Sequence, residues 1–206
     1  MSTHNTSDWE SATDTDSYED EPNNMFSAPS ATSDVILLVE DKPIHVNKAI
    51  LSLASPVFAA MFELNFKEKH AEKIPLPGKK YEDFIEFLLC LYPNTVKDVD
   101  RENIDIVLPL ADEYQVENIK RRSEAMILLL LQIKYESLFA KDVVHFLFLS
   151  DKYSFKQALV EATNIATSHC CTDLFEIKEF NSVSSAVKID ITTTGKFKKP
   201  SEVCII

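Results

Sequence analysis

The chain has 206 residues and a formal net charge of −12, with 45% hydrophobic and 10% aromatic residues. This length and composition suffice for one hydrophobic core with a small extension. An acidic chain with no expected basic face lacks the charge that neutralises phosphates, so neither nucleic acid nor an anionic membrane is expected as a partner. With only two glycines, Gly78 and Gly195, the sequence excludes the glycine-rich phosphate loops and nucleophile turns of common enzymes.

The four cysteines are Cys90, Cys170, Cys171 and Cys204, and none forms a CxxC pair. This pattern predicts reduced thiols and a cytoplasmic or nuclear location. The acidic, polar N-terminus does not resemble a signal peptide. The longest apolar run, Ala125–Leu131, is far short of the ~18–20 residues that span a bilayer.

Residues 1–32 are predicted to be a disordered acidic tail. Residues 1–30 contain seven carboxylates, no Lys or Arg, and almost no aliphatic side chains. Such a segment cannot offset its ordering entropy by burial. The exceptions are Trp9 and the apolar pair Met25–Phe26, which lies just before the predicted domain.

Three strands are predicted in the first half of the chain. Val35–Val39 is a continuous β-favouring run of the kind found in covered strands, and residues 43–46 form a shorter strand after a turn. Residues 74–77 also favour an extended conformation but contain two prolines. Because proline cannot donate to a neighbouring strand, this third strand is expected at a sheet edge.

Capping residues and apolar periodicity predict the helices. Asn47 is suited to cap a helix through residues 50–53, and Ser55–Pro56 combines a capping hydroxyl with proline at the first helical position. Asp100 is expected to cap a later helix whose inner face includes residues 104–111. The other helices are expected at 81–92, from about 116 to 131, at 135–151, at 155–169 and as one or two short segments within 172–190.

Two of the predicted helix junctions share a sequence pattern. Residues 110–116 (LADEYQV) match residues 149–155 (LSDKYSF) at three of seven positions. Both segments predict an apolar helix end, a polar elbow with a buried tyrosine ring, and a capped second helix. Two copies do not predict a solenoid.

The order and spacing of several motifs resemble the BTB (POZ) domain family over about 100 residues, most closely the compact nematode BTB and MATH-BTB proteins. The motifs are Ser33-Asp34-Val35, residues 44–51, residues 55–62, Phe66-Lys67-Glu68, Ile74-Pro75-Leu76, Phe84 through Tyr92, and Leu110-Ala111-Asp112. The first 30 residues are too short and polar for a MATH domain, so none is expected before this domain. Asn47 stands where the family usually has histidine.

The resemblance implies an α+β fold, a small mixed sheet with a helical cluster followed by a helical extension, and no enzymatic activity. The expected organisation is a tail at 1–32, the BTB domain at 33–131, a short BACK- or 3-box-like helical extension at 132–190, and a flexible C-terminal tail at 191–206.

The resemblance also implies a homodimer. Asp34 and Lys48 correspond to residues that line a charged pocket at the family's dimer interface, and Ile50 to an apolar dimer contact. Alternatively, the two charged residues lie at the surface and Ile50 belongs to the core.

Phe66 and Glu68 correspond to the motif through which many BTB proteins bind cullin-3. A substrate-recruiting adaptor of a cullin-3 ubiquitin ligase, with an unidentified protein substrate, is therefore expected. The alternative is an oligomerisation or transcriptional-regulatory module that binds no cullin, in which residues 66–68 are a solvated loop.

No catalytic, cofactor-binding or metal-binding set is predicted. His169-Cys170-Cys171 invites a metal interpretation, but adjacent helical residues point in different directions and no second ligand pair exists. Cys204 is third from the C-terminus, where prenylation requires the fourth position.

Overall fold

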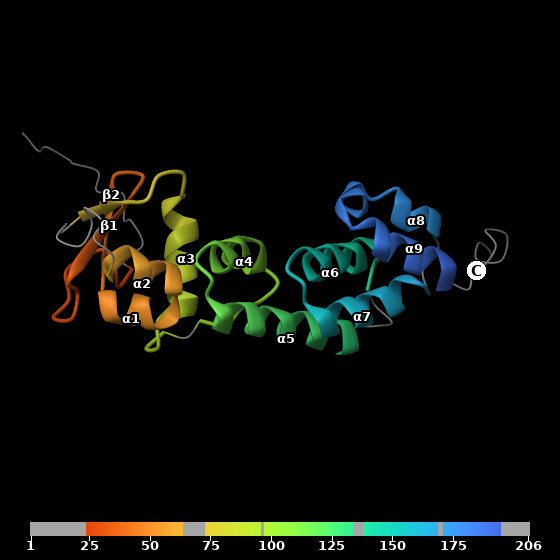
Figure 1. Ribbon diagram of the computed structural model, residues 1–206, viewed down its shortest axis with the longest axis horizontal. Coiled ribbons are helices and arrows are strands. Elements are labelled where there is room, and N and C mark those ends of the chain that lie inside the picture. Colours follow the sequence, from red (N-terminus) through yellow and green to blue (C-terminus); the bar gives the residue numbers. More distant parts are fainter. Residues whose placement is uncertain (1–23, 64–72, 96, 134–137, 169–170, 195–206) are drawn as a thin grey trace, which may run out of the picture.

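The computed structural model describes residues 24–63, 73–95, 97–133, 138–168 and 171–194. The elements are, in chain order, β1 (Val35–Val39), β2 (Lys42–Val46), α1 (Lys48–Ala54), α2 (Pro56–Glu63), β3 (Lys73–Pro75), α3 (Tyr81–Leu91), α4 (Ile104–Glu113), α5 (Glu117–Ile133), α6 (Ala140–Lys152), α7 (Lys156–Ala166), α8 (Cys171–Phe175), the 3-10 helix η3 (Lys178–Ser182) and α9 (Ser185–Thr194). The molecule is elongated, with the sheet at one end, α4 and α5 in the middle, and α6–α9 at the other end (Figure 1).

The sheet has the strand order β2-β1-β3. β1 pairs antiparallel with β2, with Val35 opposite Val46, and parallel with β3, with Leu37 opposite Ile74. Side chains of β1 alternate between buried and half-buried, so one face packs on the helices and the other is only partly covered. The mixed α+β architecture and the edge position of the proline-containing strand are as predicted.

Two of the three predicted caps are confirmed. Asn47 Oδ1 accepts from the N–H of Ile50 at 3.0 Å, and Ser55 Oγ accepts from the N–H of Phe58 at 3.0 Å. The third prediction is wrong, because Asp100 does not cap α4 but the turn that precedes it. Its carboxylate accepts from N–H groups of the following turn, and α4 begins only at Ile104. Side-chain capping of a turn competes with helix initiation, which explains the delayed start.

The two elbows have the same backbone geometry, and the tyrosine ring of each is buried, as predicted. The predicted cap of the second helix is not formed by Phe155, whose apolar side chain makes no hydrogen bond to the start of α7. Gln115 and Ser154 adopt positive φ values of 53° and 58°. The N–H of Val116 donates to the carbonyl of Ala111 at 2.7 Å, and the N–H of Phe155 donates to that of Ser150 at 2.8 Å. These bonds around a left-handed residue satisfy carbonyls at the end of α4 and of α6. The second helix of each pair then packs against the first.

Polar contacts join the extension to the rest of the molecule. Arg101, just before α4, pairs with Asp142 at the start of α6. His145 of α6 lies between two carboxylates, with Nε2 at 3.2 Å from Asp105 of α4 and Nδ1 at 2.9 Å from Glu179 of η3. The helices α5 and α7 also pack side by side. The two halves therefore share an interface of both charged and apolar contacts.

The packed chain begins and ends outside the boundaries expected from the sequence. Phe26, placed in the acidic tail, is 1% exposed, packs against the ring of Tyr92, and accepts from the N–H of His45. At the other end α9 continues to Thr194, and Ile191 is buried. Single apolar residues hold both segments to the core. No helix in the described parts of the chain is long and apolar enough to cross a membrane.

Candidate interaction surface at helix α1

Helix α1 exposes one large apolar side chain. Leu51 is fully buried, whereas Leu53 is 92% exposed and Ile50 is half-buried. Residues two apart lie on opposite sides of a helix, so Leu51 and Leu53 cannot both face the core. The sequence pattern predicts one apolar helix that contains both leucines, and their spacing is the signal that only one of them can face the core.

The start of α1 is held by two polar side chains from separate parts of the chain. The Asp34 carboxylate accepts from the backbone N–H of Lys48 at 2.7 Å, where a negative charge favours the helix terminus. The Tyr92 hydroxyl accepts from the N–H of Asn47 at 2.8 Å. Burial raises the pKa of Tyr92, and the nearby Asp34 charge raises it further. These contacts fix the direction of the exposed face.

In the structure the side chain of Asp34 contacts Lys48 only through the backbone N–H of Lys48. The Lys48 ammonium lies over the ring of Phe62, 5.9 Å from its centre, and among the described residues it forms no ion pair with Asp34. Asp34 is exposed in the single chain. A charged pocket formed by the two residues at a dimer interface stays a prediction.

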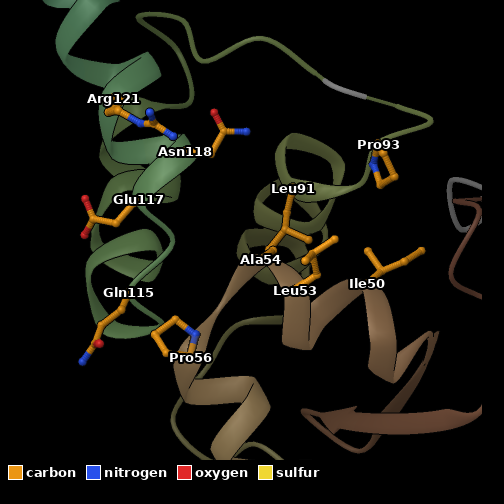
Figure 2. Close-up of a pocket in the computed structure, with 10 residues that line it drawn as sticks. All are labelled: Ile50, Leu53, Ala54, Pro56, Leu91, Pro93, Gln115, Glu117, Asn118 and Arg121. Carbon is orange, nitrogen blue, oxygen red and sulfur yellow. The ribbon is translucent and has the colours of Figure 1, made fainter.

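A hollow of about 520 Å³ lies between α1 and the start of α5. Figure 2 shows apolar side chains from α1 and the end of α3 on one side, including Ile50, Leu53 and Leu91. The opposite side carries Asn118 and Arg121. The Arg121 guanidinium points across the hollow, whereas the Glu117 carboxylate points away from it (Figure 2). Sequence reasoning missed this hollow because its sides come from three separate segments, α1, the end of α3 and the start of α5.

The distance between the two sides of the hollow is set by contacts beneath it. Ser55 Oγ donates to the carbonyl of Tyr114 at 2.5 Å, which ties the α1–α2 corner to the α4–α5 elbow. The Tyr114 ring stacks on Phe58 with 4.4 Å between ring centres. Burial also raises the pKa of Tyr114 far above its usual value. Buried contacts between the two sides therefore hold the hollow in the folded chain.

The structure does not describe every site that was predicted from the sequence. Phe66 and Glu68 lie outside the described residues. The pair Cys170–Cys171 is described only for the backbone of Cys171. Among the described residues no group of histidine, cysteine and carboxylate side chains is arranged to hold a metal ion. The hollow at α1 combines apolar side chains with Arg121, which suits binding of another protein.

The family model for the BTB/POZ domain matches residues 23–131, more than half of the chain. The chain belongs to the BTB/POZ family. The start of the match at residue 23 agrees with the buried Phe26. The α+β architecture described above is therefore a BTB domain followed by a helical extension, and the domain is a protein-interaction module.

Three similar proteins each match just under half of this chain. BTB and MATH domain-containing protein 38 of Caenorhabditis elegans is 35% identical over 91 residues, which are 44% of this chain and 23% of that protein. BTB and MATH domain-containing protein 36 of the same organism is 31% identical over 97 residues, which are 47% of this chain and 30% of that protein. ARM repeat protein interacting with ABF2 of Arabidopsis thaliana is 35% identical over 92 residues, 45% of this chain and 13% of that protein. The chain thus matches less than a third of each relative's length.

Proposed function

We propose that this BTB protein is a homodimeric adaptor that links a client protein to a cullin-3 ubiquitin ligase. The main support for a dimer is the α1 surface, where Leu53 is 92% exposed beside the half-buried Ile50. A second copy that meets the same surface would bury both side chains, and a two-fold dimer is the commonest symmetric assembly. Asp34 and Lys48, at the start of the same helix, would lie near this contact.

The cullin contact is proposed on the basis of sequence position. Phe66 and Glu68 follow the end of α2 at Glu63 and precede β3, which is where the family places its cullin-binding motif. An aromatic anchor and a charge-assisted hydrogen bond together form a common hot-spot arrangement. The helical extension packs beside α5 and would enlarge the contact.

Light scattering tests the dimer directly. The chain has a mass of 23.4 kDa, so a homodimer at micromolar concentration should scatter with twice this mass. A mass of one chain throughout that concentration range would reject the dimer.

Calorimetric titration with cullin-3 tests the adaptor function. Replacing both Phe66 and Glu68 by alanine should weaken binding by about 2–4 kcal/mol, the usual cost of losing hot-spot residues. Asp34→Ala is the control, because it alters the start of α1 and leaves residues 66–68 unchanged. Equal affinity of the double variant and the wild type would place the contact elsewhere. No binding by the wild type would favour an oligomerisation or transcriptional-regulatory module instead.

A further inference from the structure

The hollow between α1 and α5 contains polar and apolar groups that have no partner within the described part of the chain. Its apolar side includes Leu53, which is almost fully exposed, and Leu91. Arg121, on the opposite side, is exposed, and its guanidinium forms no hydrogen bond or ion pair with any other described residue. By contrast, the neighbouring Lys120 pairs with Asp112 at 2.8 Å. An aromatic ring flanked by carboxylates would match this combination of apolar wall and free guanidinium.

The chain itself contains such a segment. Trp9 is its only tryptophan, and Asp8 and Glu10 flank it. Residues 1–23 contain seven carboxylates and no Lys or Arg. Arg121 can form bidentate pairs with carboxylates, and tryptophan is the side chain that gains most from an apolar cleft with a polar rim. The segment and the hollow are complementary in charge and in apolar character.

The described chain begins beside the hollow. A second, smaller hollow is lined by Met25, Phe26, Ile50 and Pro93, and the last two residues also line the larger one. Trp9 lies fifteen residues before Asn24. A flexible linker of that length has a root-mean-square span of about 21 Å, so it can reach a neighbouring cleft at high effective concentration.

We propose that the segment around Trp9 docks in the hollow between α1 and α5 of its own chain, with the indole against Leu53 and Leu91 and a flanking carboxylate on Arg121. The volume of about 520 Å³ falls within the range of pockets that enclose small ligands. Docking covers Leu53 and so competes with any second copy that binds α1. The N-terminal segment then acts as an internal competitor of the interaction surface.

Because Trp9 is the only tryptophan, its fluorescence reports on docking without any label. The full chain is measured over a dilution series, with its mass determined by light scattering in the same samples. In samples that contain single chains, acrylamide should quench Trp9 at least about twofold less than in Leu53→Glu, because a docked indole is shielded from the quencher. Arg121→Glu should also expose Trp9. The matched control is Leu129→Glu, which changes an exposed leucine of α5 outside the hollow and should leave the shielding unchanged.

The outcomes separate tail docking from the proposed dimer. Shielding in single chains that is lost in Leu53→Glu supports docking, whether or not a dimer forms at higher concentration. Equal quenching of Trp9 in the wild type and in both hollow variants, at every concentration, overturns it. Shielding that appears only in samples of doubled mass also overturns it, because Trp9 then contacts a second copy.

Discussion

Ser150, at the elbow between α6 and α7, has a buried hydroxyl without a partner. Its Oγ is inaccessible and accepts or donates no hydrogen bond within the described structure. The matching position of the first elbow is Ala111, which is equally buried. The two elbows thus bury different side chains at matching positions. Only Ser150 has a hydroxyl, which loses its hydrogen bond to water when the chain folds.

Ser150→Ala should therefore stabilise the protein. Removing a buried hydroxyl that has no partner recovers its desolvation cost, about 1 kcal/mol in the free energy of unfolding. Urea denaturation measures this change. The control is Ser123→Ala, because the buried Ser123 hydroxyl donates to the carbonyl of Ile119 at 2.9 Å. A gain in stability for Ser123→Ala equal to that of Ser150→Ala would refute the explanation.

Cys90 illustrates how burial controls reactivity. It lies on the inner side of α3, and burial raises the pKa of its thiol from 9.0 to about 11, with the Glu86 carboxylate adding to the increase. A raised thiol pKa means that the folded state favours the protonated form. The contribution of the protonated Cys90 thiol to the free energy of unfolding is complete below pH 9 and is lost as the pH rises toward 11.

The same shift predicts slow alkylation of Cys90. At pH 8 its thiolate fraction should be about a hundredfold lower than that of an ordinary thiol, since two pKa units are two powers of ten. Iodoacetamide labelling followed by peptide mass spectrometry should find Cys90 unmodified until urea unfolds the chain. Rapid modification of Cys90 in the folded protein would show that the thiol is not buried as described.

At the scale of single elements, α7 depends on a residue from α5 for its cap. Phe155 at the N-cap position has no side-chain hydrogen bond to the helix. Instead, Glu124 Oε1 accepts from the N–H of Gln157 at 3.1 Å. A carboxylate at a helix N-terminus is favourable for both hydrogen bonding and the helix dipole. Glu124 therefore couples the BTB domain to its extension.

Glu124→Ala should loosen α7 selectively. The expected loss is about 1 kcal/mol, typical of removing a helix cap. Amide hydrogen exchange should become faster in the first turn of α7 and remain unchanged in α3, whose contacts are separate. Glu161→Ala, on α7 itself, is a suitable comparison because Glu161 makes no hydrogen bond or ion pair in the described structure. Unchanged exchange in α7 of Glu124→Ala would contradict the capping role.

Elements defined by local sequence were predictable, and those defined by tertiary contacts were not. Asn47 and Ser55 cap their helices through bonds to residues three positions on, so spacing alone identified them. Phe26 has no periodic apolar neighbours, and its burial depends on Tyr92, which lies far along the chain. The hollow depends in the same way on Arg121 and Leu53 from distant helices. Such pairings follow from the folded topology and leave no local signal.

For the whole molecule, the structure combines a BTB domain with an extension that is fixed to it. Arg101–Asp142 and the His145 pairs with Asp105 and Glu179 join the two halves beside the packed helices α5 and α7. The α1 surface lies at the other end, on the side of the sheet (Figure 1). A surface far from the extension leaves the extension free in a dimer, which suits an adaptor that binds a second protein there.

We propose that α1 forms the contact between two copies of the chain, and sedimentation equilibrium of the wild type, Leu53→Glu and Leu129→Glu tests this contact. A buried glutamate at a self-contact meets its own copy and is strongly unfavourable. We expect the wild type and Leu129→Glu to sediment as dimers at micromolar concentration, and Leu53→Glu to sediment as a folded monomer of 23.4 kDa. Unchanged dimerisation of Leu53→Glu, or a monomeric wild type, would contradict it.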